Sequence, residues 1–169
     1  MISDRACIKI RRAVLEDGSA LAAIFGGSWR EAYQGIIPAP HLESMILRRD
    51  QAWWINAATT DNQMIVVEVA GVVVGYATAG TARNKGRFGG EIYEIYLAPT
   101  YQGVGIGEYL FEACRDQLDR RRLSGLIVWA LADNDRAAQF YWRRGGRPIG
   151  EVKESFGRTQ LRKIGYGWT

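Results

Sequence analysis

The chain has 169 residues, of which 47% are hydrophobic and 24% are charged. This length and composition predict one globular domain, spanning residues 1–169, with a hydrophobic core of its own. The formal net charge of +4 comes from 22 Lys and Arg against 18 Asp and Glu, without a dense basic run. That charge pattern argues against a nucleic-acid partner and suits a small anionic ligand.

The cysteines and the single histidine argue against a metal site. Cys7 and Cys114 lack metal-ligand spacing, and His41 is the only histidine, so we predict no metal. The sequence has neither a secretory leader nor an apolar run long enough to span a bilayer. We therefore expect a cytoplasmic protein with no membrane partner.

Hydrophobic periodicity and turn residues divide the chain into strands and helices. Strands are expected where apolar and polar residues alternate, or where short runs are rich in β-branched residues. Helices are expected where apolar residues recur every three or four positions after a capping residue. In chain order the expected elements are strand 8–11, a helix from an N-cap at Asp17 to Ala32, a helical region over 41–58 in one or two pieces, strands 64–69, 72–79 and 91–97, helix 106–118, strand 126–131, helix 136–144, and strands 148–153 and 159–166.

This order of elements predicts the fold class. A β-hairpin turning at Ala70-Gly71 leads into a further strand, and a β-α-β unit follows it. Parallel strands need a crossover helix, whereas hairpins give antiparallel neighbours. We therefore expect an α/β (α+β) domain in which helices cover both faces of a mixed sheet.

The segment Gln102-Gly103-Val104-Gly105-Ile106-Gly107 is the most informative motif. It joins strand 91–97 to the next helix, and its alternate glycines expose backbone N–H groups at the positive end of that helix. Such a turn is suited to a phosphate. A dinucleotide-binding turn would need its third glycine at Glu108 or Leu110, and a P-loop would need Gly-Lys-Ser/Thr, so neither fits. A tight turn without a ligand is the alternative.

A second motif follows the expected strand 126–131. An asparagine, an alanine and a tyrosine have the spacing Asn-x-x-Ala-x-x-x-Tyr, in a helix that two glycines close. Together with the glycine loop, this segment resembles the GNAT superfamily of acyl-CoA-dependent N-acetyltransferases. The resemblance covers nearly the whole chain and is strongest over residues 91–146. The residues that carry it are Gln102, Gly105, Gly107, Asn134, Ala137, Tyr141 and Gly145.

The resemblance implies a sheet of about seven mostly antiparallel strands, splayed where acetyl-CoA binds as co-substrate. The coenzyme pyrophosphate would lie on the N–H groups of residues 102–107, and the pantetheine arm would lie along strand 91–97. The N–H of Leu97 would then polarise the thioester carbonyl. The implied coenzyme-binding residues are Leu97, Ala98, Gln102, Gly103, Val104, Gly105, Ile106, Gly107, Asn134 and Tyr141.

For Tyr141 and Asn134, the role that the resemblance implies has an ordinary structural alternative. By resemblance, Tyr141 is the general acid that protonates the departing thiolate, whose ordinary pKa of about 8.5 lies near that of a phenol, about 10. A helical tyrosine can equally pack in a core. Asn134 is the implied coenzyme-contacting asparagine, and it also stands where a helix N-cap is expected.

Glu91 and Glu94 are the candidates for the general base that deprotonates the amine. Glu91 occupies the strand position at which several members carry a base, and we expect it to act through a water. Strand alternation puts the two glutamates on opposite faces unless a bulge intervenes. Each can also be a rim carboxylate or a salt-bridge partner. Where some members carry a glutamate on the following strand, this chain has Trp129.

The acceptor is expected to be a primary amine of a small molecule or a peptide. By location, Trp29 and Tyr33, with His41, are the candidate acceptor-binding residues, although clustered aromatic residues are also typical of a core. The alternatives are a non-catalytic CoA-binding sensor or structural module, and a transferase for another acyl-CoA. The apolar C-terminal strands also allow a homodimer.

Overall fold

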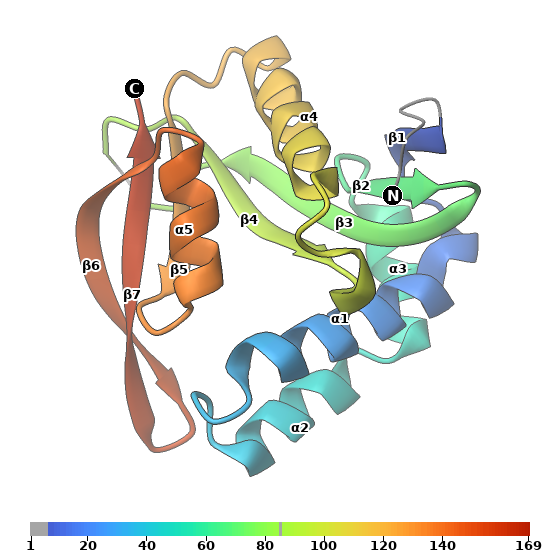
Figure 1. Cartoon of the computed structure of the whole chain (residues 1–169), viewed down its shortest axis with the longest axis horizontal. Coiled ribbons are helices and arrows are strands. Elements are labelled where there is room, and N and C mark those ends of the chain that lie inside the picture. Colours follow the sequence, from blue (N-terminus) through green and yellow to red (C-terminus); the bar gives the residue numbers. More distant parts are fainter. Residues whose placement is uncertain (1–6, 85) are drawn as a thin grey trace.

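A computed structural model describes residues 7–84 and 86–169 and contains a seven-stranded sheet of order β1-β2-β3-β4-β5-β7-β6 (Figure 1). Neighbouring strands are antiparallel except for β4 and β5, which are parallel. The predicted mixed, mostly antiparallel sheet is thus confirmed. The strands are β1 (Ile8–Arg12), β2 (Ile65–Val69), β3 (Val72–Thr81), β4 (Gly90–Leu97), β5 (Leu126–Leu131), β6 (Arg147–Phe156) and β7 (Thr159–Trp168).

Five α-helices lie in the described ranges, and they enclose the sheet from both sides. The predicted helical region over 41–58 is two helices, because the chain leaves helical geometry at Arg49 and Asp50 caps the next helix. The Asp50 side chain accepts a hydrogen bond from the Trp53 N–H at 2.9 Å, as an N-cap does. The helices are α1 (Gly18–Tyr33), α2 (Ala39–Arg48), α3 (Gln51–Thr60), α4 (Ile106–Arg120) and α5 (Asp135–Arg143).

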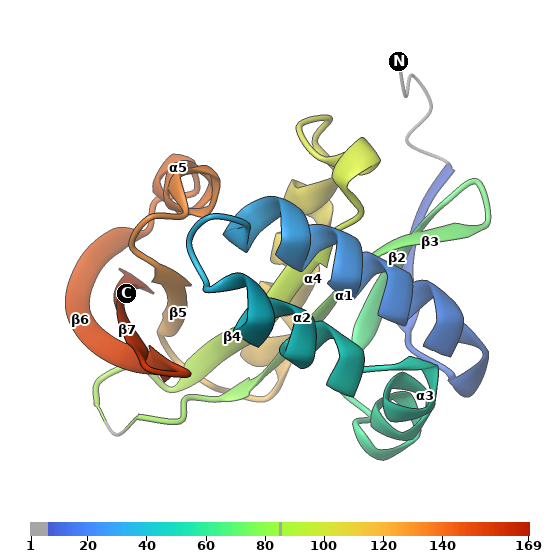
Figure 2. The same cartoon turned by 90° about the horizontal axis from the view of Figure 1, so that it is seen from below.

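The helices lie on both faces of the sheet (Figure 2), and each face carries its own hydrophobic core. On one face α1, α2 and α3 pack over β2, β3 and the end of β5, around Phe25, Trp54 and Tyr76. On the other face α4 and α5 pack over the central strands, around Phe111 and Tyr141. The central strands are therefore held from both sides, which gives the groups at their ends a rigid support.

A β-bulge in β4 decides where its two glutamates point. Thr78 pairs with Glu94 and the next residue of β3 pairs with Ile92, so Tyr93 is an extra residue on β4. Glu94 and Glu91 consequently pair with Thr78 and Gly80, which are two positions apart and share a face. Both glutamates therefore lie on the face that α1 and α3 cover, and the opposite-face arrangement of an unbroken strand does not occur.

The parallel strands β4 and β5 separate soon after they pair. Their ladder runs only from Gly90 opposite Leu126 to Ile92 opposite Val128, although β4 continues to Leu97. The remaining edge of β4 therefore has no strand partner on the β5 side. This opening in the middle of the sheet confirms the predicted splay.

Candidate functional site

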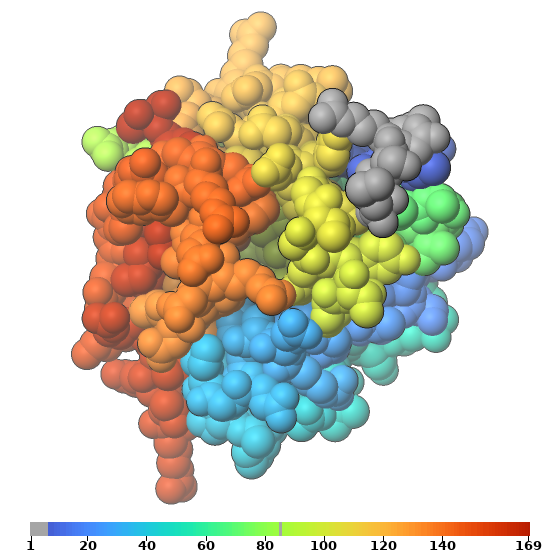
Figure 3. Space-filling model, in the orientation of Figure 1, coloured from blue at the N-terminus to red at the C-terminus, as the bar shows by residue number. Residues whose placement is uncertain are grey.

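A cavity of about 700 Å³ lies where β4 and β5 separate. Its wall combines most of β4, parts of β5 and the glycine loop with one side of α5 and the end of α1. In Figure 3 the orange surface of α5, the yellow surface around the glycine loop and the light-blue surface of α1 meet around this hollow. A volume of this size suits a small-molecule ligand.

The glycine loop forms one wall through its backbone. Gly103 and Gly105 have φ angles of +77° and +89°, in the left-handed region that side chains disfavour. Gly105 is the N-cap residue of α4 and offers no side-chain cap, so the first N–H groups of this helix stay available for an anion. Neither Val104, whose side chain is exposed, nor Ile106, whose side chain is buried in the core, lines the cavity wall, so a coenzyme-binding role of these two would rest on their backbone N–H groups.

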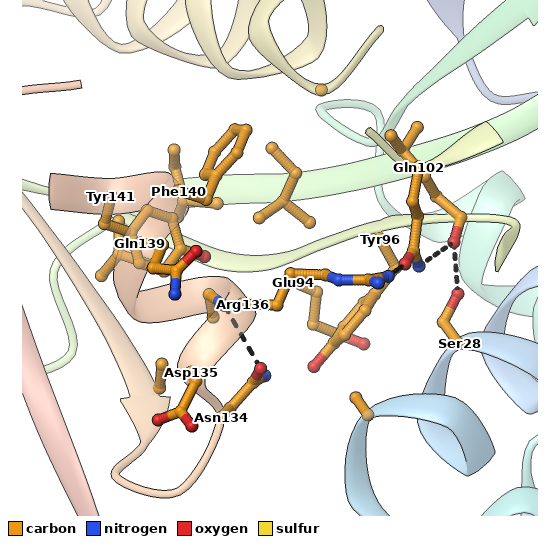
Figure 4. Close-up of a pocket in the computed structure, with 18 of the residues that line it drawn as sticks. Ser28, Glu94, Tyr96, Gln102, Asn134, Asp135, Arg136, Gln139, Phe140 and Tyr141 are labelled. Atoms are coloured by element: carbon orange, nitrogen blue, oxygen red, sulfur yellow. Dashed lines mark hydrogen bonds between the residues drawn. The ribbon is translucent and has the colours of Figure 1, made fainter. Parts of the chain in front are cut away.

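The carbonyl of Leu97 is held by two side chains instead of by β5. It accepts hydrogen bonds from Ser28 Oγ at 2.7 Å and from Gln102 Nε2 at 3.1 Å (Figure 4). Ala98 N–H donates across to Val74 on β3 at 2.7 Å. Since N–H groups alternate sides along a strand, those of Leu97 and Ile95 point toward the opening. Ile95, Ser28 and Tyr96, which also line the cavity, are contributors that the motifs did not identify.

Asn134 and Tyr141 both reach the cavity from α5 and its N-cap (Figure 4). Asn134 Oδ1 accepts a hydrogen bond from Ala137 N–H at 3.2 Å, so the residue caps the helix and lines the cavity at once. Tyr141 is only 6% exposed and packs against the Phe111 and Tyr166 rings. Burial raises the pKa of Tyr141 well above its ordinary value, so the phenol keeps its proton at neutral pH.

The structure separates the two candidate bases. Glu91 is 1% exposed, lies outside the cavity wall, and accepts hydrogen bonds from the backbone and guanidinium of Arg83. Glu94 lines the cavity, and its Oε1 accepts from Tyr76 Oη at 2.9 Å and from Arg49 Nη1 at 2.8 Å. Glu94 is therefore the carboxylate that a molecule in the cavity can reach.

Only one of the three predicted acceptor-binding residues lines the cavity. Tyr33 lines the cavity, and its hydroxyl is 2.8 Å from that of Tyr96. Trp29 packs between the Phe25 and Tyr33 rings and does not reach the wall. His41 lies against Phe156, away from the cavity. Their positions along the chain thus predicted one residue of the cavity wall, Tyr33, and two residues that pack elsewhere, Trp29 and His41.

Arg136, at the start of α5, extends across the entrance of the cavity (Figure 4). Its guanidinium donates to Gln102 Oε1 and forms an ion pair with Glu31 Oε1 on α1 at 3.4 Å. The partners are 34 and 105 residues away in sequence. No local motif could have identified this contact.

A metal-binding cluster and a membrane-spanning helix are both absent from the described residues, 7–84 and 86–169. These residues contain no group of three or more His, Cys, Asp or Glu side chains placed to hold a metal ion. None of their helices is both long enough and apolar enough to cross a bilayer.

Ser28→Ala should lower the free energy of unfolding by about 1–2 kcal/mol, because the part-buried Leu97 carbonyl loses one of its two donors. Urea denaturation measures this loss. The control is Ser19→Ala, an exposed position in the first turn of α1, for which a change within about 0.5 kcal/mol is expected. Equal effects of the two substitutions would contradict the role given to Ser28.

Comparison with known proteins shows which family of proteins this chain matches. A model of the acetyltransferase (GNAT) family matches residues 27–146. The N-acetyltransferase YuaI of Bacillus subtilis, itself named uncharacterized, is 27% identical over 162 residues, which cover 95% of this chain and 92% of that protein. The N-alpha-acetyltransferase RimI of Mycobacterium tuberculosis is 30% identical over 114 residues, which cover 64% of this chain and 70% of that protein.

Solved structures share the fold over nearly the whole chain. The PaiA N-acetyltransferase from Thermoplasma acidophilum, in complex with coenzyme A, matches with a TM-score of 0.74 at 19% identity, covering 93% of this chain and 97% of that one. The ribosomal-protein-alanine N-acetyltransferase from Brucella melitensis matches with a TM-score of 0.69 at 25% identity, covering 95% and 98%. These similarities confirm the predicted fold.

Proposed function

The chain belongs to the acetyltransferase (GNAT) family, and on this premise we propose that it transfers the acetyl group of acetyl-CoA directly to a primary amine of a small molecule or peptide. The observation that carries the proposal is the cavity at the separation of β4 and β5. It brings an uncapped helix N-terminus, unpaired strand N–H groups and a buried phenol to one place. Those are the groups that acyl transfer from a phosphate-bearing thioester requires.

The free edge of β4 supports binding of the coenzyme arm. The phosphates are assigned to the N–H groups of residues 102–107, and the amide-containing arm is assigned to the β4 edge, where it would pair as a strand does. This leaves the thioester beside the N–H groups of Ile95 and Leu97. A donor aimed at the developing oxyanion lowers the barrier, because it is already oriented before the reaction.

The proposed reaction needs one attack and two proton transfers. The neutral amine attacks the thioester carbonyl carbon, the carbon–sulfur bond breaks, and the sulfur leaves as a thiolate. Tyr141 donates its proton to this thiolate, and the nitrogen loses its extra proton to a base. Cys7 is exposed and Cys114 is fully buried in the core, so direct transfer without a covalent acyl-enzyme is the simpler route.

Burial raises the pKa of a thiol as it raises that of a phenol, which bears on the proton transfer from Tyr141 to the leaving thiolate. In water a phenol would be the weaker acid by about 1.5 pKa units, which opposes the transfer. Burial, however, raises the pKa of a thiol as well, and it raises the pKa of Cys114 in the same core to about 12. A coenzyme thiolate released against the buried Tyr141 phenol would likewise be more basic than in water, which favours its taking the Tyr141 proton.

Glu94 is the better of the two candidate bases, because it alone lies on the cavity wall. Its Oε1 is occupied by Tyr76 and Arg49, which leaves Oε2 as the oxygen to accept a proton from the amine or from a bridging water. The Arg83 contacts support a structural role for Glu91 in the loop before β4.

The names of the relatives favour amine acceptors, including peptide N-termini. The RimI relative is an N-alpha-acetyltransferase, and the Brucella melitensis structure is a ribosomal-protein-alanine N-acetyltransferase. The same site fits a non-catalytic CoA-binding module or a transferase of another acyl group, although a buried phenol in the cavity favours turnover. A homodimer through the C-terminal strands stays a prediction.

Acetyl-CoA should bind the purified chain and stabilise it. At a hundredfold excess over its Kd a ligand adds about 2.7 kcal/mol, which raises the Tm of a domain of this size by roughly 5–10 °C. Thermal denaturation and calorimetry measure the effect, with adenosine as a control that lacks phosphates and thioester. The absence of any binding would refute the proposed function.

Tyr141→Phe should lower kcat by about 10²- to 10⁴-fold and leave the Kd of acetyl-CoA nearly unchanged, because only the transferable proton is removed. An amine panel with detection of the released thiol supplies the assay. Tyr166→Phe, at a buried neighbour whose ring contacts Tyr141, is the matched control and should keep its activity. Unchanged turnover in Tyr141→Phe would show that another group supplies the proton.

Glu94→Gln should reduce kcat/KM more than tenfold near neutral pH, and raising the pH should restore part of the rate as more of the amine becomes neutral. Glu91→Gln should instead destabilise the fold, by weakening the Arg83 contacts, with kcat retained in the folded fraction. Rates at several pH values and urea denaturation of both variants test this assignment. The reverse result would make Glu91 the base.

A further inference from the structure

We propose that Arg136 is a switch residue, which bridges Gln102 and Glu31 in the empty site and turns to the coenzyme phosphates when they occupy the glycine loop. The inference rests on the proposed function, since it assumes a phosphate-bearing donor at residues 102–107. It adds a residue outside the glycine loop and links donor binding to the contact between α5 and α1.

Three elements meet at the Arg136 side chain. Its guanidinium donates to Gln102 Oε1 in the glycine loop and pairs with Glu31 on α1 at 3.4 Å. The same Gln102 side chain uses Nε2 to hold the Leu97 carbonyl at 3.1 Å. The guanidinium is thereby connected, through one amide, to the end of β4 (Figure 4).

The contacts of Arg136 are weak enough to be exchanged. Its side chain is 68% exposed and that of Glu31 is 48% exposed, and exposed ion pairs contribute at most about 1 kcal/mol. A phosphate carries more charge than a carboxylate and can take two parallel hydrogen bonds from a guanidinium. A phosphate on the adjacent loop therefore competes successfully for the same side chain.

Arg144, another arginine of this wall, is less suited to such an exchange. Arg144 is tied to Glu108 and to the Phe140 carbonyl, and it stacks on the Phe140 ring at 4.0 Å. Its side chain is 14% exposed, so it is held in place by packing. Arg136 alone among the cavity arginines contacts the first residue of the glycine loop.

The exchange has a consequence for the acceptor side. Glu31 is followed in α1 by Ala32 and Tyr33, which line the cavity. When Arg136 turns to a phosphate, the ion pair between α5 and α1 is released at this entrance. Glu31 thus opposes donor binding by holding Arg136, and donor binding frees the end of α1.

A double-mutant cycle on coenzyme A affinity tests the switch. Arg136→Ala should raise the calorimetric Kd of coenzyme A about tenfold, because a charge-assisted contact to phosphate is lost. Glu31→Gln should lower the Kd by about 1.5- to 5-fold, because Arg136 is no longer held. In the double variant the gain from Glu31→Gln should disappear, since there is no guanidinium left to release.

Two further variants serve as controls for the effect of Arg136→Ala on the Kd of coenzyme A. Arg136→Lys keeps the charge without the planar fork and should give an intermediate Kd. Arg120→Ala removes an exposed α4 arginine that pairs with Asp116 outside the cavity, and it should leave the Kd unchanged. All substituted positions are exposed, so each variant should fold, and its Tm verifies this.

The outcomes separate the two proposals. An equal gain from Glu31→Gln with and without Arg136 would reveal only a general effect of negative charge and would overturn the switch. An unchanged Kd in Arg136→Ala would overturn it as well. Either result with normal wild-type binding leaves the proposed function intact, whereas a wild-type chain that binds neither coenzyme A nor acetyl-CoA would overturn both.

Discussion

The site depends on the point where β4 and β5 stop pairing. After Ile92 and Val128 the edge of β4 has no strand beside it, although buried backbone groups must find partners. Ser28 and Gln102 satisfy the Leu97 carbonyl, while the N–H groups on the same edge face the cavity. The Leu97 carbonyl is therefore satisfied although the sheet is open at this point, and the opening has room for a ligand that pairs as a strand would.

A single extra residue in β4 organises the charges beside this opening. The bulge at Tyr93 turns Glu91 and Glu94 to the same face, where each meets a different arginine. Glu91 is buried and Arg83 binds both of its carboxylate oxygens, whereas Arg49 and Tyr76 hold Glu94 by one oxygen at the cavity wall. Two carboxylates that look alike in sequence thus have different access to a ligand. Access, more than residue type, separates a structural carboxylate from a reactive one.

Rigid and exchangeable contacts occur side by side around the cavity. Tyr141 is fixed among aromatic rings of the core, and the same burial that raises its pKa keeps its proton available. Arg136 lies at the exposed rim and is held by contacts that a phosphate can replace. The proposed proton donor is therefore positioned before a ligand arrives, while the entrance can respond to the ligand. Catalytic precision and ligand access place opposite demands on rigidity, and different elements meet them.

The sequence by itself determined the order of elements, the mixed sheet and the local motifs, since periodicity, caps and glycine turns are short-range signals. Among the residues that it singled out, Asn134, Tyr141, Gln102, Gly103, Gly105 and Gly107 line the cavity, and their roles stay predictions. It did not determine which glutamate faces the cavity, because a bulge depends on register with β3. Nor did it reveal that Trp29 and His41 pack away from the cavity, or that Ser28 and Arg136 reach Leu97 and Gln102. Those contacts join residues far apart in the chain, and only the packing of helices and strands in three dimensions brings them together.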